Sequence, residues 1–527
     1  MECKYCKTQN KDDYIYCMNC GRKLHQKESS FDPKSLLKNK FVLIGVALAA
    51  ALLLLLVLNP FVSGKTSSVS EEISIPRTKP QIYSENENVY IYDGMTKIEI
   101  FEGSSSGNKQ YSFDNQAAAF SVSKEDVNEL HVLYKGKTSK VTDDFTEFKI
   151  SDSGENILYH SESDGSIHLY NCKNKKDKVV VSAEEEPEGV EAVTLSYTGD
   201  KFGFVRLIDG DDHVYLYSSS GVKEIPVEGF MSIQAVSEKG EVFYLNFEDE
   251  ALYVCDGTNN TLICEDYDIL TFNREYSQVA VVENEEFVLY KNGTVLRTEA
   301  EGIDSAYSII VPQRILGSIY VTYDSYGEHK PIYHIGVGGF ENHYYQTKDK
   351  DLIYLGKNLE RKTICEKAGA YLLSNDGKIL FYTDEEGLLH RYENKDEIVS
   401  EEPLDLKQFY AWDSVNKGLY FLTNSKELAY LDDEGLKIAG SNKVEQGICC
   451  NDGYFYFKDG SKFYASRKGE EAVEVGELKG SSLNYTGYDF IGIDGISYQG
   501  KDKDVYFIKD GEAHKLDIGG EKQEGEA

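Results

Sequence analysis

The stretch SDSGENILYHSESDGSIHLY at residues 151–170 contains two strand-like segments separated by an acidic turn. It opens with a Ser-x-x-Gly turn and ends in a tyrosine. The stretch SNDGKILFYTDEEGLLHRY at residues 374–392 follows the same plan. Alternating apolar residues bounded by Gly, Ser and Asp predict short strands joined by tight turns. The two stretches therefore predict a repeated, mainly β domain.

The same plan recurs along most of the chain. Close copies lie at 196–217 and 237–253, looser copies at 418–430, 453–464 and 495–507, and degenerate copies at 82–101, 130–150 and 271–290. The anchoring glycines are Gly154, Gly199, Gly240, Gly377, Gly418, Gly453 and Gly495; apart from the longer interval between Gly240 and Gly377, neighbours are 45, 41, 41, 35 and 42 residues apart. A period near 40 residues with a strand–turn–strand rhythm is typical of β-propeller blades, which bury their apolar faces against one another.

These units resemble the repeats of TolB-like propellers, and less closely the Tyr-rich propeller repeats of bacterial surface proteins. The resemblance implies a fold and no particular activity. Ten or eleven units can be drawn between residues 82 and 516, whereas one ring normally holds four to eight blades. We therefore predict one ring of seven or eight irregular blades over residues 81–520. An antiparallel sandwich and an elongated repeat array are the alternatives.

A second decisive segment is FVLIGVALAAALLLLLVL at residues 41–58, which has no charged residue and no polar face. At 1.5 Å per residue it spans roughly 27 Å, close to the thickness of the bilayer hydrocarbon core. Forty mostly polar residues precede it, which does not fit a cleaved signal peptide. We predict a single transmembrane helix over residues 41–62.

Flanking charge predicts the orientation of this helix. Residues 1–62 contain nine Lys and Arg against five Asp and Glu, whereas the remainder of the chain has a net charge of −38. The positive-inside rule places the basic linker at 27–40 in the cytoplasm and the large domain outside the cell membrane. Residues 63–80, rich in Ser, are expected to form a flexible stalk, and residues 521–527 an acidic tail.

The N-terminal segment CKYCKTQNKDDYIYCMNCGRKL carries two Cys-x-x-Cys pairs, Cys3 with Cys6 and Cys17 with Cys20. Four thiolates at this spacing suit the tetrahedral coordination of zinc, and they leave no open position for catalysis. Two disulfides are the rival interpretation, which the reducing cytoplasm disfavours, and a redox pair is another. We predict a structural zinc ribbon over residues 1–26.

This N-terminal segment resembles the zinc-ribbon domain found on many bacterial membrane proteins, which is followed by a basic linker, one membrane helix and a variable outer domain. The resemblance implies an interaction or assembly module, and hence a cytoplasmic protein partner. We expect no nucleic-acid partner, because the large domain is acidic and the ribbon offers little basic surface.

Catalytic and ligand-binding motifs in the large domain are weak. GSSSG at 103–107 matches the pattern around a nucleophilic Ser105, but no apolar helix follows, so we expect a turn. The acidic segments SESDG at 161–165 and DGDD at 209–212 lack the full spacing of a calcium loop and are expected to be hairpin turns.

Three further features have both a structural and a functional interpretation. His329, His334 and His343 fall where the repeat breaks, at 303–350, and are interpreted as part of a long loop with core aromatics rather than a metal site. Cys255 and Cys264 either bridge across a hairpin or, like Cys172, Cys365, Cys449 and Cys450, remain free thiols. Trp412, the sole Trp, is expected in the core rather than on a sugar-binding platform.

Taken together, these features predict a non-enzymatic membrane-anchored sensor or scaffold. Its propeller would bind a protein, peptide or glycan outside the cell. The first alternative is a cell-envelope hydrolase whose active site lies on propeller loops. The second makes the ribbon the active end and the propeller a passive cap.

Overall fold

The computed structural model describes residues 80–518, with short gaps, of which the longest are 183–189, 300–308, 311–319, 336–342 and 479–487. The predicted zinc ribbon, linker, transmembrane helix, nearly all of the stalk and the acidic tail lie outside the described residues. Among the described residues there is no helix at all, and so none long and apolar enough to cross a membrane.

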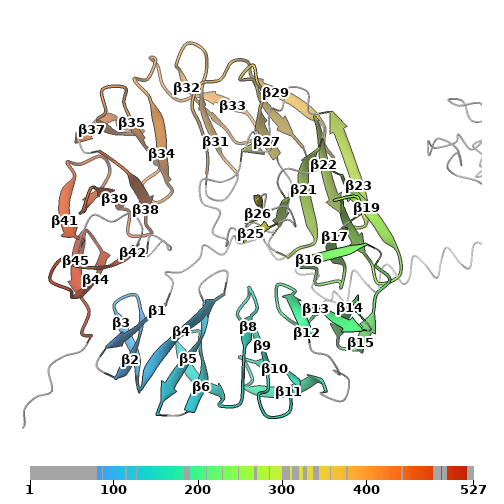
Figure 1. Cartoon of the computed structure of the whole chain (residues 1–527). Coiled ribbons are helices and arrows are strands. Elements are labelled where there is room, and N and C mark those ends of the chain that lie inside the picture. The colour runs from blue at the N-terminus through green and yellow to red at the C-terminus, as the bar shows by residue number, and fades with distance from the viewer. Residues whose placement is uncertain are drawn as a thin grey trace, which may run out of the picture. The chain divides into compact units, whose positions relative to one another are not determined.

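The described strands form eleven sheets, which follow one another in chain order around a ring (Figure 1). We number them as blades 1 to 11. Outside blades 6 and 7, neighbouring strands within a blade are antiparallel and consecutive in the chain, with the first strand toward the middle of the ring and the last at its periphery.

Blades 1 to 4 contain β1 (Gln81–Glu85), β2 (Asn88–Asp93) and β3 (Thr96–Glu102); β4 (Ser104–Tyr111), β5 (Ala117–Lys124), β6 (Val127–Tyr134) and β7 (Lys137–Thr142); β8 (Phe148–Ile150), β9 (Asn156–His160), β10 (Ile167–Asn171) and β11 (Lys176–Val181); β12 (Val190–Leu195), β13 (Phe202–Ile208), β14 (Asp211–Ser218) and β15 (Gly221–Glu224). Blades 5 to 7 contain β16 (Phe230–Val236), β17 (Val242–Asn246), β18 (Leu252–Cys255) and β19 (Asn260–Cys264); β20 (Leu270–Asn273), β21 (Gln278–Glu283), β22 (Glu286–Lys291) and β23 (Thr294–Glu299), with β25 (Tyr320–Tyr323) and β26 (His329–Ile335); β24 (Ile309–Ile310), β27 (His343–Gln346), β28 (Leu352–Leu355) and β29 (Arg361–Cys365). Blades 8 to 11 contain β30 (Tyr371–Leu373), β31 (Leu380–Thr383), β32 (Leu389–Tyr392) and β33 (Asp396–Ile398); β34 (Gln408–Asp413), β35 (Gly418–Leu422), β36 (Leu428–Asp432) and β37 (Gly435–Gly440); β38 (Gln446–Cys449), β39 (Phe455–Asp459), β40 (Lys462–Ser466) and β41 (Val473–Glu477); β42 (Tyr488–Asp489), β43 (Ile496–Gln499), β44 (Val505–Lys509) and β45 (Glu512–Lys515).

The hydrophobic core lies between the blades. The described residues form eleven buried clusters, and each joins one blade to the next. The last of them closes the ring, because Tyr90 and Tyr92 on β2 pack against Phe507 on β44 and against Leu516. Across the same seam the Tyr92 hydroxyl donates to the Asp517 carbonyl at 2.7 Å. A single blade cannot bury both faces alone, so stacking between blades supplies the core.

The propeller prediction is therefore confirmed, and the prediction of seven or eight blades is wrong. The described residues form one closed ring of eleven blades, which excludes the sandwich and the elongated array. The ten or eleven repeat units drawn from the sequence include the observed number of blades. The prediction of seven or eight came from the usual ring size of four to eight. The copy drawn at 130–150 is also wrong in its bounds, since it straddles blades 2 and 3.

The repeated Ser-x-x-Gly has a structural cause, which blade 3 illustrates. The Ser151 side chain is fully buried in the turn between β8 and β9, where its hydroxyl accepts from the Asn156 N–H at 3.1 Å. The Gly154 N–H donates to the Ser151 carbonyl at 2.8 Å, and Gly154 has φ +70°. Blade 6 uses Asn273 in place of the serine and Tyr276, at φ +53°, in place of the glycine, which explains its degenerate sequence.

The segment at 303–350, predicted as a long loop, contributes four strands. β24 and β27 belong to blade 7, whereas β25 and β26 extend blade 6. β26 pairs with β20 and runs parallel to it, unlike the antiparallel pairing within every other described sheet. β25 and β26 thereby lie toward the middle of the ring in Figure 1.

Candidate functional site

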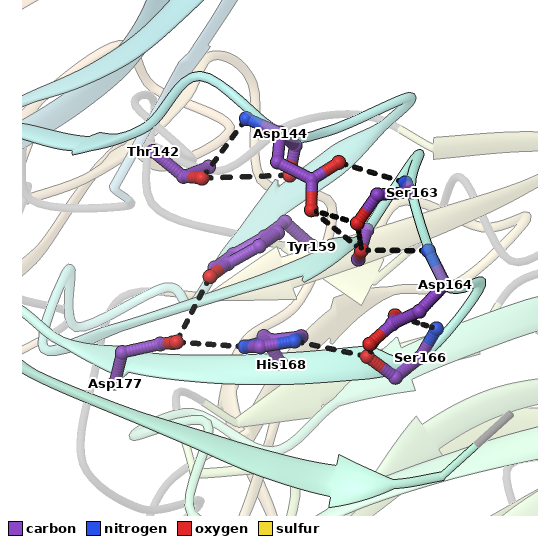
Figure 2. A network of polar contacts seen from close by, with 9 residues as sticks. Thr142, Asp144, Tyr159, Ser163, Asp164, Ser166, His168 and Asp177 are labelled. Atoms are coloured by element: carbon purple, nitrogen blue, oxygen red, sulfur yellow. Dashed lines mark hydrogen bonds and ion pairs between the residues drawn. The ribbon is translucent and has the colours of Figure 1, made fainter.

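A network of polar contacts lies in blade 3, at the turn between β9 and β10 (Figure 2). Asp144, in the connection from β7 to β8, accepts from the Ser161 hydroxyl at 2.7 Å and from the Ser163 N–H at 2.8 Å. Asp164 accepts from the Ser166 hydroxyl at 2.5 Å and from the Ser166 N–H at 2.8 Å. The acidic segment SESDG is thus a hairpin turn, as predicted.

A line of three side chains continues from this turn along the sheet. The His168 Nε2 lies 2.9 Å from the Ser166 hydroxyl oxygen, and its Nδ1 lies 2.7 Å from Asp177 Oδ2. Antiparallel pairing places the Tyr159 ring against the His168 ring, with centroids 4.8 Å apart, and its hydroxyl donates to Asp177 at 3.0 Å. Figure 2 shows Tyr159 and His168 both directed at Asp177.

The order Ser166, His168, Asp177 is that of a nucleophile, a base and an orienting acid. The hydrogen-bond pattern argues against catalysis by Ser166. The Ser166 hydroxyl is the donor toward Asp164, whose pKa is lowered to about 2 by that hydrogen bond and which is therefore an acceptor only. The hydroxyl proton of Ser166 is thus directed away from His168. Ser166 is also only 2% exposed, so a substrate carbonyl cannot reach its oxygen.

Blade 8 repeats the arrangement. The Tyr382 and His390 rings stack with centroids 4.8 Å apart, and Tyr382 donates to Asp396 at 2.9 Å. His390 Nδ1 lies 3.0 Å from Asp396 Oδ2, and its Nε2 lies 3.2 Å from Asp384 Oδ2. Burial and the nearby Asp396 carboxylate raise the pKa of Tyr382 far above its usual value. The two networks occupy equivalent positions in the repeat, which indicates a shared structural element.

Sequence reasoning missed these histidines, although a signal was present. The two stretches first compared, 151–170 and 374–392, each place a histidine two residues before the final tyrosine. The acid that completes each network lies on the next strand, beyond the quoted stretch, and pairing in the sheet brings it back to the histidine.

The other candidate residues are not brought together. Ser105 lies in β4, where its N–H donates to the Ser84 hydroxyl at 2.9 Å, so the predicted turn is wrong and no nucleophile elbow forms. His343 lies in β27, while His329 and His334 lie in β26 of another sheet. Burial lowers the pKa of His343 to about 3, and its ring packs 4.7 Å from that of Phe287. The interpretation of a core aromatic is confirmed for His343.

The thiols and the tryptophan are also structural. Sheet register places Cys255 opposite Asn260 and Cys264 opposite Leu252, at the two ends of one hairpin, and no disulfide joins them. The bridged alternative is therefore wrong. Cys172, Cys365, Cys449 and Cys450 likewise form no disulfide. Trp412 packs against Phe381 at 4.9 Å between ring centroids, as expected of a core residue.

The antiparallel register of β13 and β14 places Ile208 opposite Asp211, which confirms the hairpin predicted there. Within the described part of the chain, no three His, Cys, Asp or Glu side chains are placed to hold a metal ion together. The predicted zinc ligands Cys3, Cys6, Cys17 and Cys20 lie outside the described residues.

Comparisons with known proteins found distant structural similarity alone. No family model and no curated protein matches the chain. Among solved structures, TolB from Acinetobacter baumannii is 13% identical over 43% of this chain and 60% of its own, with a TM-score of 0.25. The tricorn protease is 10% identical over 82% of this chain and 46% of its own, with a TM-score of 0.22. The chain thus spans less than two thirds of the length of either of these structures.

Proposed function

We propose that this chain is a non-enzymatic membrane-anchored binding or scaffold protein. A structural zinc ribbon formed by Cys3, Cys6, Cys17 and Cys20 lies in the cytoplasm and recruits a protein partner. One helix over residues 41–62 crosses the cell membrane. The propeller lies outside, where its turns bind a protein, peptide or glycan.

The observation that supports the proposal is that the polar side chains of blades 3 and 8 are hydrogen-bonded to one another. In the networks of blades 3 and 8 the hydroxyls and carboxylates are hydrogen-bonded to one another, and Ser166, beside His168 in blade 3, is buried. Such groups hold the blade in shape rather than act on a substrate. A large rigid ring with exposed acidic turns is suited to recognition, since loops on a rigid scaffold commonly carry binding residues.

The alternative of an envelope hydrolase has one observation in its favour, the order Ser166, His168, Asp177. The full-length chain, purified in detergent, should be tested against peptide and glycan panels for both binding and turnover. We expect binding without product formation. Turnover that disappears in Ser166→Ala would instead establish the hydrolase.

The membrane and zinc assignments have tests of their own. The full-length chain should contain one zinc ion, measured by elemental analysis, and Cys17→Ser with Cys20→Ser should lose it. Cys365→Ser, which alters a half-buried thiol of blade 7, should retain it. Protease added to intact cells should cleave the propeller and spare the ribbon. Zinc retained in the double variant, or a protected propeller, would contradict the assignment.

A further inference from the structure

The outermost strand of blade 9, β37, has two exposed side chains, and both are apolar. Leu436 is 53% exposed and Ile438 is 48% exposed. The only charged side chain of the strand, Lys437, is ion-paired with Asp432 at 3.1 Å and with Glu434 at 2.9 Å. Each of the other ten outermost strands that the structure describes exposes at least one polar or charged side chain. Exposed charges usually protect such strands from pairing with another chain, and β37 lacks this protection.

The two faces of β37 are covered to different extents. On the blade 10 side, the turn before β41 lies directly on the strand, since a Cβ added to Gly469 would be 3.0 Å from the Lys437 Cβ. On the opposite face, sheet register places Leu436 beside Leu431, which packs against the hydrophobic cluster shared with blade 8. Cross-strand neighbours share a face, so Leu436 and, two residues further on, Ile438 point toward blade 8. The outermost strand of blade 8, β33, is only three residues long, and both apolar side chains remain about half exposed.

The main chain of β37 also has a free edge, at the periphery of the ring in Figure 1. The strand pairs with β36 on one side, and among the described strands none pairs with its other side. Within the described residues, its one main-chain hydrogen bond outside the sheet runs from the Ala472 N–H to the Ala439 carbonyl at 2.7 Å. That bond lies near one end of the strand, so residues 435–438 remain open to pairing. Such an edge presents N–H and C=O groups at the spacing of an extended peptide.

The charges around this edge are mainly negative. The neighbouring stretch of blade 8, residues 393–402, has one base, Lys395, and five exposed acids: Glu393, Asp396, Glu397, Glu401 and Glu402. The turn at 432–434, which begins β37, adds three acids, of which Glu434 is 74% exposed. Two copies of a domain with a net charge of −38 repel one another, whereas a positively charged partner is attracted. Charge therefore favours a basic partner over a second copy of this chain.

We propose that the free edge of β37 is a docking site for an extended, positively charged segment of a partner protein, which adds to blade 9 as a fifth strand. The main chain of this segment pairs with residues 435–438. Its apolar side chains cover Leu436 and Ile438, and its Lys or Arg side chains meet the carboxylates of blade 8 and of the turn at 432–434. This inference rests on the proposed binding function, and it specifies the surface and the class of partner.

Hydrogen–deuterium exchange on the full-length chain in detergent tests the site with the synthetic peptide (Lys-Val)4 as a probe. Binding should slow the exchange of amides in residues 433–440 and leave those in 176–181 unchanged, since β11 there exposes charged side chains beside Val179. The peptide (Lys-Pro)4 has the same charge but lacks every second N–H, and (Glu-Val)4 has the opposite charge. Neither should slow exchange at 433–440. Equal protection by (Lys-Pro)4 and (Lys-Val)4 would overturn the proposal, because charge alone would then explain binding.

Substitution locates the binding energy. Leu436→Lys with Ile438→Lys should weaken the binding of fluorescent (Lys-Val)4 about tenfold in anisotropy titrations, because apolar contact is replaced by like charge. Val179→Lys with Val222→Lys adds the same charge to the outermost strands of blades 3 and 4 and should leave the affinity unchanged.

Three results would overturn the proposal. The first is unchanged exchange at 433–440 in the wild-type chain with (Lys-Val)4 bound, which needs no variant to fold. The second is equal affinity of the wild type and the Leu436→Lys, Ile438→Lys variant. The third is a wild-type dimer that dissociates in this variant, since a second copy would then occupy the edge. The peptide and glycan panel tests the proposed function separately: absence of any ligand would refute that function, whereas a ligand bound without β37 would refute only this inference.

Discussion

The contact between neighbouring blades at the Ser-x-x-Gly turn predicts a strong effect of Gly154→Ala. Gly154 has φ +70°, and a Cβ added there would lie 2.4 Å from the Ala117 Cβ and 3.0 Å from the Ser112 Cβ, both in blade 2. Under 3.0 Å, either the turn or blade 2 must move. Gly165, in the next turn of the same blade, has φ +72° and nothing within 4 Å of the added Cβ.

The two substitutions therefore share a backbone cost and differ in packing. An L-residue in the left-handed region costs ~1–2 kcal/mol. Overpacking adds ~1–3 kcal/mol where neighbours must shift. The gain from a stiffer unfolded chain, ~0.4–1 kcal/mol, applies to both variants and cancels in the comparison. Gly154→Ala should thus lower the free energy of unfolding by ~1–3 kcal/mol more than Gly165→Ala does.

Urea unfolding of the full-length chain in detergent, followed by far-UV circular dichroism and by Trp412 fluorescence, measures the difference. Agreement between the two probes would show that the blades unfold together. Equal destabilisation by Gly154→Ala and Gly165→Ala would refute the argument that the turn approaches the neighbouring blade closely.

Three further predictions follow from single contacts. Tyr276→Phe removes a hydrogen bond from the turn of blade 6 to Asp152 in blade 3 and should lower the free energy of unfolding in urea by ~1 kcal/mol. Tyr253→Phe, which removes an exposed hydrogen bond within one hairpin, should lower it less. A larger loss in Tyr253→Phe than in Tyr276→Phe would contradict this prediction. Leu516→Ala at the ring-closing seam should cost ~2–3 kcal/mol and increase limited proteolysis at the seam, and an unchanged protein would mean that the ring closes elsewhere. The pKa of Asp164 is lowered to about 2, so the charged carboxylate stabilises the fold at pH values above the ordinary pKa of Asp, and this stabilisation is lost as the pH falls through about 2. Asp164→Asn should therefore be less stable than wild type at neutral pH and equally stable below about pH 2. A stability difference that does not change with pH would contradict the charge argument.

The local structure of the blades could be predicted from the sequence. The Ser-x-x-Gly turns, the acidic hairpin turns and the apolar alternation are decided by neighbours a few residues away. Ser151 and Gly154, for example, complete a turn whose hydrogen bonds lie within six residues. Degenerate units were harder to recognise in the sequence, because Asn273 and Tyr276 form the same turn in blade 6 as serine and glycine do in the other blades.

The candidate site was less predictable. His168 and His390 were visible in the compared stretches, but neither histidine has a functional meaning until sheet pairing supplies Asp177 and Asp396 from the next strand. Likewise, Ser105 matched a nucleophile pattern that lacked the following apolar helix, and its place inside β4 shows that no elbow forms.

By itself the sequence determined that residues 81–520 would form a ladder of short antiparallel strands that must stack to bury their faces. It did not determine the number of blades in the ring. Ring size depends on the angle between successive blades, which is set by how the side chains of one sheet fill the space against the next. It also depends on whether the last blade meets the first, and here Tyr90 and Tyr92 meet Phe507 across more than 400 residues of chain. That contact exists only in the folded molecule, because no local pattern specifies it.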